Sequence, residues 1–383
     1  MSTSSDFDNF PRRIVILGAT GSIGRNAVAI AAAHPQLFQV ECVTCRSHAE
    51  ELVRLAEDCN AVERFCANAP AISTLPSEEA VNELIASDRV DIVVCAIQGI
   101  AALRSVMTAL KAGKTVALAT KEVLVGAGQW VMDTVRQFGG RILPVDSEHC
   151  ALFQCLAGNK TRDVRKLWLT CSGGPFHAHP EIDLHSVTPE QASHHPAWNM
   201  GPKITLDSAT LVNKAFEIIE AAWLYGMSED KVGVVIHPQA VIHSMVEFTD
   251  GAVLAQLGPT DMKLPIQYCM TYPQRYPAMM TPLDFSRAMN LYFMPPDTRR
   301  FPALDLAHQT LRMGGLAGAV FNAANDAACA RFRRHSLAFD EIPEAIAEAL
   351  NHTPNGQPDS YEAINDAERI AWEYVEHFGK SHR

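Results

Sequence analysis

Short apolar runs alternate with longer helical stretches through the first 145 residues. The first run, residues 13–17, leads into a Gly-rich turn and an Ala-rich stretch that ends at Ala33. Four further runs of this kind occupy residues 38–43, 91–96, 115–119 and 141–145. The α/β alternation predicts a Rossmann-like, doubly wound parallel sheet that binds ligands at the carboxyl ends of its strands.

The turn after the first run carries Gly18, Gly21 and Gly24, spaced GxxGxxG rather than GxGxxG. Glycines at such a turn let a pyrophosphate approach the backbone, and the following helix supplies oriented N–H donors. After the second run stand Arg46 and Ser47, where an acidic residue would hold the ribose 2′-hydroxyl of NADH. A cation and a hydroxyl suit a 2′-phosphate, which favours NADPH. The alternative, that Arg46 is an ordinary exposed arginine with no role in binding, fits the sequence equally well.

A strand-like run over residues 167–170 leads into the S-G-G sequence that begins at Ser172. A Ser beside two glycines can present its hydroxyl and several N–H groups to an anion. The next stretch is rich in His and Pro and lacks periodicity, which predicts an active-site lid without regular structure over residues 175–202. The lid side chains that could close over a small polar ligand are His195, Trp198 and Met200.

A helix is predicted after Asp207, with Ser208 near its start, where the hydroxyl could cap the helix or bind an anion. Its apolar stripe comprises Val212, Phe216, Ile219 and Trp223. Asn213, Lys214 and Glu217 fall together on an adjoining face. A plain surface ion pair between Lys214 and Glu217 is the alternative, but Asn213 has poor helix propensity and argues against it.

Three acidic residues stand out as candidate metal ligands. Asp146 and Glu148 follow the run at residues 141–145, and in an extended chain their carboxylates would point the same way. With Glu217 they would form an oxygen-ligand site for Mg²⁺ or Mn²⁺, because converging carboxylates repel unless a cation lies among them. The alternative is three solvated surface acids.

The remaining pattern divides the second half of the chain. Residues 241–248 and 252–257 flank a Thr-Asp-Gly turn and predict a hairpin that completes a central sheet. Helical patterns over residues 317–333, 342–350 and 361–378 predict a C-terminal helical bundle. The expected domains are an NADPH-binding domain, a central α+β catalytic domain that contains the lid, a Pro-rich linker and the helical domain, at residues 12–146, 147–281, 282–305 and 306–383.

Composition narrows the possible partners. A chain of 383 residues with 48% hydrophobic and 20% charged residues is typical of a multidomain globular protein. Its net charge of −11 argues against nucleic acid or an anionic membrane as the main partner. Ten cysteines scattered through apolar segments suit reduced, buried thiols, and the C-x-x-C of Cys42 and Cys45 is best read as chance. The amino-terminal residues resemble neither a secretory signal nor a transit peptide, so a cytoplasmic location is expected.

Five blocks in this order resemble the 1-deoxy-D-xylulose 5-phosphate reductoisomerases: G-A-T-G-S-I-G, L-P-V-D-S-E-H, S-G-G-P-F, H-P-A-W-N-M-G and D-S-A-T-L-V-N-K-A-F-E. The resemblance continues through I-H-P-Q-A-V-I-H-S-M-V-E-F and F-N-A-A-N-D, and it covers the chain from about residue 12. It implies a homodimeric enzyme of isoprenoid precursor biosynthesis that uses NADPH and a divalent cation. Its substrate would be a small phosphorylated sugar, 1-deoxy-D-xylulose 5-phosphate, rearranged in a retro-aldol and aldol sense and then reduced to 2-C-methyl-D-erythritol 4-phosphate.

The shared motifs also imply roles for individual residues. The metal would be held by Asp146, Glu148 and Glu217. The substrate phosphate and nearby oxygens would meet Ser172, His195, Ser208, Asn213 and Lys214. Ser147, Glu148 and Lys121 would contact the substrate elsewhere, and Trp198 would cover it, so that Lys121, His195 and Trp198 join the three carboxylates in catalysis. The cofactor would contact Thr20, Gly21, Ser22 and Ile23 at its pyrophosphate, and Arg46, Ser47, Thr120, Glu122 and Gly201 elsewhere.

Several positions depart from the family pattern. Cys150 stands where Asn is common, Cys171 replaces a small residue, and Thr120 replaces Asn before Lys-Glu. The loop at Arg46 also differs, but no departure touches the three carboxylates. Two rival hypotheses are an NADP-dependent semialdehyde or homoserine dehydrogenase that shares only the nucleotide domain, and a non-catalytic relative.

Overall fold

The structure is a computed structural model that describes residues 10–193 and 201–379. Two compact units make up the chain. The first holds residues up to Val123 together with Val131–Cys150 and Asp261–Leu283. The second holds Leu124–Trp130, Ala151–Thr260 and the chain from Asp284 onward.

The first unit is built on a six-stranded parallel sheet with strand order β3-β2-β1-β4-β5-β6. The strands are β1 (Arg12–Leu17), β2 (Phe38–Cys45), β3 (Glu63–Cys66), β4 (Ile92–Cys95), β5 (Thr115–Leu118) and β6 (Arg141–Pro144). The order reverses beside β1, as in doubly wound nucleotide-binding sheets, so the predicted fold class is confirmed. Strand β3 was missed, because it has only four residues and begins with the polar pair Glu63-Arg64.

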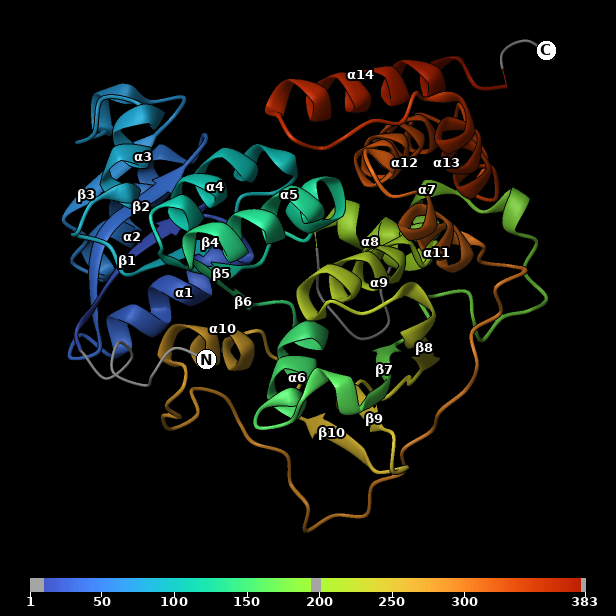
Figure 1. Cartoon of the computed structure of the whole chain (residues 1–383), viewed down its shortest axis with the longest axis horizontal. Helices are drawn as coiled ribbons and strands as arrows, with labels where there is room; N and C mark the ends of the chain where they lie inside the picture. Colours follow the sequence, from blue (N-terminus) through green and yellow to red (C-terminus); the bar gives the residue numbers. More distant parts are fainter. Residues whose placement is uncertain (1–9, 194–200, 380–383) are drawn as a thin grey trace. The chain divides into compact units, whose positions relative to one another are not determined.

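Helices cover both faces of this sheet. The first unit contains α1 (Ser22–Ala33), α2 (Ala49–Asp58), α3 (Glu78–Ala86), α4 (Leu103–Lys111) and α10 (Lys263–Thr271), with parts of α5 (Glu122–Phe138) and α6 (Ser147–Leu156). Helix α1 packs against α2 and α10, and α3 packs against α4. Figure 1 shows α1 and α10 on one side of the sheet and α3 and α4 on the other. The central strands are therefore buried on both sides, and the side chains of Ile14, Val15 and Ile16 are fully enclosed.

The second unit contains a four-stranded sheet with strand order β10-β9-β7-β8. Its strands are β7 (Val164–Cys171), β8 (Val232–Ile236), β9 (Ile242–Phe248) and β10 (Val253–Leu257). Strands β9 and β10 form the expected antiparallel hairpin, and β9 also pairs antiparallel with β7. Helix α9 (Val212–Tyr225) packs on β7 and β8, next to α8 (Pro202–Ala209).

The C-terminal helices form the predicted bundle within the second unit. They are α11 (Ala303–Met313), α12 (Ala317–Arg333), α13 (Glu341–His352) and α14 (Tyr361–His377). Helix α12 is central, because it packs against the other three. Between α10 and α11 the chain is irregular and makes an isolated bridge from Met294 to Ile236.

Part of the segment expected to be a structureless lid is helical. The structure has a 3₁₀ turn at Leu184–Ser186 and the short helix α7 (Pro189–Ala192). A capping box between Thr188 and Gln191 starts α7, a local signal too short to produce visible periodicity. The candidate residues His195, Trp198 and Met200 lie outside the described residues.

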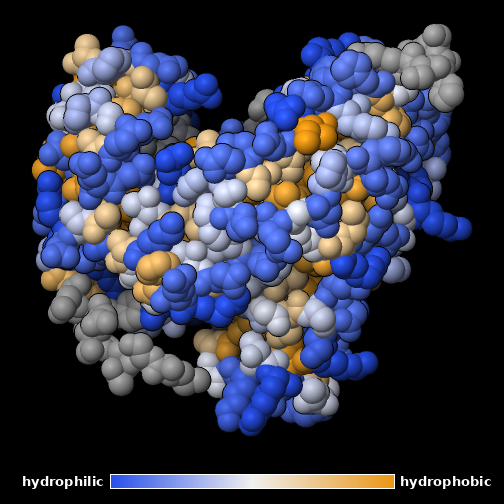
Figure 2. All heavy atoms as spheres, turned by 45° about the horizontal axis from the view of Figure 1, so that its top comes forward, coloured by the Kyte–Doolittle hydropathy of each residue, from blue (hydrophilic) through white to orange (hydrophobic). Residues whose placement is uncertain are grey.

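One general expectation, about the cysteines, can be compared with the structure. All ten cysteines, which lie within the described residues, are buried free thiols, as predicted. Among the described helices, none is both long and apolar enough to cross a membrane. Figure 2 shows polar residues over much of the visible face, with hydrophobic residues scattered among them.

Candidate active site

Asp146 and Glu148 lie at the start of a helix, so the prediction that they share one face of an extended chain was wrong. Strand β6 ends at Pro144, and α6 begins at Ser147. The Glu148 N–H donates to Asp146 Oδ1 at 3.1 Å, which makes Asp146 a cap of α6. Ser147 Oγ donates to Glu148 Oε2 at 2.5 Å. The helix start thus holds both carboxylates in a defined relation.

Lys121 approaches this pair from the neighbouring strand. It follows β5 at the amino end of α5, and its Nζ lies 2.8 Å from Asp146 Oδ2. Strands β5 and β6 are adjacent in the parallel sheet, so the residues beyond their carboxyl ends meet at one edge. This is the edge where doubly wound sheets bind ligands.

Glu217 belongs to the second unit and is held by two neighbours on its own helix. Asn213 Nδ2 donates to Glu217 Oε1 at 2.7 Å, and Lys214 Nζ pairs with Oε2. The side chains of Lys214 and Glu217 are only 5% and 1% exposed, which excludes the surface ion pair. Burying a carboxylate is unfavourable unless it is paired and hydrogen-bonded, and the amide and the ammonium meet this need.

The predicted helix is in fact two helices joined by a strained turn. Ser208 lies in the last turn of α8 rather than near a helix start, so that prediction was wrong. The break occurs at Leu211, which has φ +61° and ψ 11° and is buried. A non-glycine residue in this left-handed region costs about 1–2 kcal/mol. Because a leucine does not indicate such a turn, the sequence pattern predicted one helix instead of two.

The S-G-G turn packs directly against α8. A β carbon at Gly174 would lie 2.7 Å from the Ser208 carbonyl oxygen, so only glycine allows this approach. The Gly174 N–H donates to Ser172 Oγ at 3.4 Å. Ser172 and Ser208 are both half-buried. The turn and the last turn of α8 therefore bring two of the candidate phosphate contacts into one region.

The glycines of the turn between β1 and α1 differ in how much room they leave for a side chain. A β carbon at Gly24 would lie 2.2 Å from the Gly18 carbonyl oxygen, which makes glycine a packing requirement there. At Gly21 the nearest atom would be 3.4 Å away, an ordinary contact, and the residue is exposed at the amino end of α1. Of the neighbouring candidates, Thr20 is buried, Ser22 is exposed and Ile23 is half-buried.

The other candidate cofactor residues lie in several places. Arg46 and Ser47 are exposed just after β2, and the Asn68 N–H donates a hydrogen bond to the Arg46 carbonyl oxygen at 2.8 Å. Thr120 is buried and donates to the Ile97 carbonyl. Glu122 is half-buried at the start of α5, and Gly201 is exposed at the cap position of α8.

A buried polar network in the second unit was missed from the sequence. Asp207 of α8 forms an ion pair with Lys203 on the same helix and accepts a hydrogen bond from Asn325 on α12. Lys203 also pairs with Asp326, and burial raises the pKa of the Asp326 carboxyl, an effect that Lys203 opposes. The four-residue spacing of Lys203 and Asp207 was a visible signal. Nothing local pointed to Asn325, although it belongs to the F-N-A-A-N-D block.

The fold and the side chains together define an oxidoreductase of the dinucleotide-binding class, with a site rich in carboxylate and hydroxyl oxygens. Family models described as 1-deoxy-D-xylulose 5-phosphate reductoisomerase match residues 14–128, and those of its C-terminal domains match residues 142–225 and 257–374. The chain belongs to the 1-deoxy-D-xylulose 5-phosphate reductoisomerase family. The matches reach far beyond the nucleotide domain, which rules out the rival dehydrogenases.

Similar proteins support this assignment. A 1-deoxy-D-xylulose 5-phosphate reductoisomerase of Pseudomonas syringae pv. syringae is 44% identical over 393 residues, covering 97% of this chain and 99% of that protein. The enzyme from Zymomonas mobilis, solved in complex with NADPH, has a TM-score of 0.87 and 37% identity over 95% of this chain and 98% of its own. A reductoisomerase solved with NADPH, fosmidomycin and magnesium has a TM-score of 0.88 and 34% identity, over 96% and 98% of the two chains.

Proposed function

We propose that this chain uses NADPH and a divalent cation to convert 1-deoxy-D-xylulose 5-phosphate into 2-C-methyl-D-erythritol 4-phosphate, in isoprenoid precursor biosynthesis. The observation that carries the proposal is the similarity of the chain, over nearly its whole length, to reductoisomerases that include one solved with NADPH, fosmidomycin and magnesium. Asp146 pairs with Lys121 at the carboxyl edge of the first sheet, and buried Glu217 pairs with Lys214 on α9. Relatives similar over nearly their whole length carry the name of this activity.

The acidic residues fit a hard divalent cation. Asp146, Glu148 and Glu217 would offer three carboxylates to Mg²⁺ or Mn²⁺, ions that prefer oxygen ligands. The hydrogen bond from the Glu148 N–H to Asp146 supports this role, because it orients one ligand against the other. When bound, the cation supplies Lewis acidity to the ketone and hydroxyl oxygens of the substrate.

The phosphate of the substrate would be held within the second unit. Its proposed contacts are Ser172, Ser208, Asn213 and Lys214, with His195 added from the resemblance. Lys214 brings a positive charge to a buried place, and the half-buried serines bring hydroxyl donors. A firm grip on the phosphate matters because the carbon–carbon bond is broken and remade, so neither fragment must leave.

The remaining substrate contacts are assigned by motif. Lys121 and Ser147 would bind substrate oxygens near the carboxylates, and Trp198 would cover the substrate and exclude water. Lys121 can donate a hydrogen bond there while it remains paired with Asp146, since an ammonium carries three donors.

The cofactor would lie across the carboxyl edge of the first sheet. Its pyrophosphate would meet residues Thr20, Gly21, Ser22 and Ile23, and the exposed position of Gly21 at the amino end of α1 supports this placement. Arg46 and Ser47 would bind the 2′-phosphate that distinguishes NADPH. Thr120, Glu122 and Gly201 would complete the contacts, and NADPH supplies the hydride for the final reduction.

We further propose a cytoplasmic homodimer with the four domains expected from the sequence. Strand β10 lies at the edge of its sheet, and Val253 and Leu254 on it are 51% and 44% exposed. An exposed apolar edge strand is a ready surface for pairing with another chain. The buried, reduced thiols suit the cytoplasm.

The decisive experiment is NADPH oxidation with 1-deoxy-D-xylulose 5-phosphate, followed by absorbance with and without Mg²⁺. Glu217→Gln keeps the shape of the side chain but removes its charge, and it is expected to abolish turnover. Cys150→Asn restores the residue common in the family and is expected to keep it. Turnover that survives Glu217→Gln would reject the metal assignment, and a folded wild-type protein with no turnover would favour the non-catalytic relative.

A further inference from the structure

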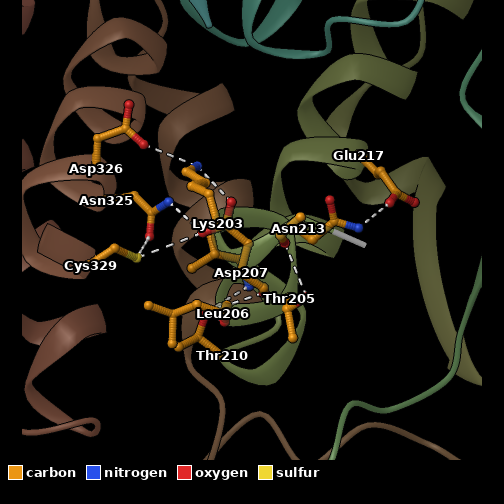
Figure 3. Close-up of polar contacts among 12 residues, drawn as sticks. Lys203, Thr205, Leu206, Asp207, Thr210, Asn213, Glu217, Asn325, Asp326 and Cys329 are labelled. Carbon is orange, nitrogen blue, oxygen red and sulfur yellow. Dashed lines mark hydrogen bonds and ion pairs between the residues drawn. The ribbon is translucent and has the colours of Figure 1, made fainter. Parts of the chain in front are cut away.

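Asp207 stands directly before the candidate phosphate contact Ser208 and is almost fully buried. Its side chain is 3% exposed, and it has strong partners on both oxygens. Lys203 Nζ lies 2.6 Å from Oδ2, and Asn325 Nδ2 donates to Oδ1 at 2.9 Å. Figure 3 shows Lys203 between Asp207 and Asp326, with Asn325 pointing toward Asp207. A contact between α8 and α12 is thereby made through charged groups.

The same helix α12 also reaches α9. Lys203 Nζ lies 5.0 Å from the ring centroid of Phe216, and Phe216 packs edge-on against Phe321 at 5.5 Å. Phe216 is the residue before Glu217. Helix α12 therefore holds the segments on both sides of the strained residue Leu211, which lies between Ser208 and Asn213.

Local hydrogen bonds connect the turn at Leu211 to Asp207. Thr210 Oγ1 donates to the Asp207 carbonyl at 3.2 Å and accepts from the Val212 N–H at 3.4 Å. A strained residue keeps its conformation only when its surroundings over-determine it. If Asp207 were released from α12, the turn could relax, and Ser208 would then shift relative to Asn213 and Lys214.

Stability alone gives little reason for such a network. Replacing buried ion pairs by apolar groups of similar size is often neutral or stabilising, because the charges lose their hydration. Charged groups with short, directed contacts do, however, fix one geometry in preference to others.

We infer that Lys203, Asp207 and Asn325 form a positioning clamp that sets the distance of Ser208 from Asn213 and Lys214, and through it the affinity of the site for a phosphate monoester. The inference rests on the proposed function, because it takes the substrate phosphate as the ligand of these residues. The three clamp residues act through Ser208, Asn213 and Lys214 and need not touch the substrate.

The test compares Asn325→Ala and Asn325→Leu with the wild type, each loaded with NADPH and Mg²⁺. Calorimetry would measure the Kd for inorganic phosphate, and kinetics would measure KM for both substrates. The Kd for phosphate and the KM for 1-deoxy-D-xylulose 5-phosphate are expected to rise about tenfold, equivalent to about 1.4 kcal/mol. The KM for NADPH should stay within about twofold, because no clamp residue belongs to the first unit.

Two further variants separate positioning from mere stability. Asn322→Ala is the matched control, since buried Asn322 on α12 donates to Glu368 of α14 rather than to α8. It should lower the melting temperature and leave the phosphate Kd unchanged. The double exchange Asp207→Asn with Asn325→Asp reverses donor and acceptor at equal total charge. It should bring the Kd back to within about threefold of the wild type.

The possible results are distinguishable. A folded Asn325→Leu protein with wild-type phosphate Kd and wild-type KM would overturn the clamp, whatever its melting temperature. If both single variants fail to fold, the double exchange decides: a folded protein with the phosphate Kd raised tenfold overturns it. A wild-type protein that binds phosphate but does not turn over the sugar phosphate would reject the proposed function alone. One that turns over the sugar phosphate but binds no phosphate would reject the clamp alone, and one that does neither would reject both.

Discussion

Lys121 Nζ and Asp146 Oδ2 lie 2.8 Å apart, with both side chains largely enclosed. The two residues come from different places in the chain and meet because β5 and β6 are neighbours. Asp146 Oδ1 meanwhile accepts the Glu148 N–H at the start of α6. A single carboxylate thus links a lysine, a helix start and a proposed metal ligand.

Replacing Lys121 by Met should lower kcat/KM about ten- to a hundredfold. The variant loses a hydrogen bond to a charged group, an interaction of about 1.5–3 kcal/mol, and leaves Asp146 without its ammonium partner. Steady-state kinetics would measure the effect. Arg136→Met is the control, because Arg136 pairs with Asp133 at an exposed place and should change kcat/KM less than twofold. A folded Lys121→Met protein with full activity would contradict the proposed role of Lys121.

The glycines of the first turn should respond differently to alanine. Gly24→Ala places a β carbon 2.2 Å from a backbone oxygen and should lower the melting temperature strongly. Gly21→Ala meets no atom closer than 3.4 Å and should leave the melting temperature nearly unchanged. It should nevertheless raise the KM for NADPH, since the methyl group would occupy the space proposed for the pyrophosphate. An unchanged KM for NADPH in Gly21→Ala would place the cofactor elsewhere.

The buried thiols should resist alkylating and disulfide reagents at pH 8. Burial raises the pKa of Cys42 to about 12 and that of Cys95 to about 11, so both stay protonated and unreactive. Counting thiols with an aromatic disulfide should show few in the native protein and ten after denaturation. Rapid native labelling of most thiols would show that the fold opens easily.

The same pKa shifts predict how the stability of the fold changes with pH under alkaline conditions. Between about pH 9 and 12 the unfolded chain loses thiol protons that the folded chain keeps, so stability falls as the pH rises. Below pH 9 the contribution of these thiols is complete. Melting temperatures across pH 8–11 would measure the trend, with Cys42→Ala and Cys95→Ala as the variants in which it should weaken.

His237 should be important for stability. Its Nε2 accepts the N–H groups of Val241 and Ile242, both at 3.2 Å, and its Nδ1 contacts the Tyr292 carbonyl at 2.9 Å. His237→Ala leaves these buried groups without the ring, and about 2–5 kcal/mol of unfolding free energy should be lost. Urea denaturation would measure it. His185→Ala, at an exposed histidine, should change stability little.

Elements with a strong periodic pattern could be read directly from the sequence. The predicted helix at residues 317–333 has the observed bounds of α12, and five of the six parallel strands were predicted from the alternating apolar runs, although their order was not. Strand β3 could not be found, because only Phe65 and Cys66 of its four residues are buried. The turn at Leu211 could not be predicted either, since tertiary packing rather than residue type keeps the backbone of Leu211 in the left-handed region.

The candidate site was readable in part for similar reasons. Asn213, Lys214 and Glu217 lie one helical turn apart, so their contact follows from local spacing. Asp146 and Glu148 were placed in extended chain because an apolar run precedes them, although an acidic residue before Ser-Glu is also a helix-start signal. The contacts of Asp207 with Asn325 and of Lys121 with Asp146 depend on the tertiary fold. Spacing along the chain contains no information about either.

The bond between Asp207 and Asn325 limits how far this protein can be shortened. A fragment that stops after α10 would retain Ser172, Ser208, Asn213, Lys214 and all three acidic candidates, yet Asp207 would face solvent without its amide donor. Removing the terminal helices would therefore weaken substrate binding, although every proposed substrate contact would remain in the fragment. Exchanging those helices between relatives would likewise alter substrate affinity.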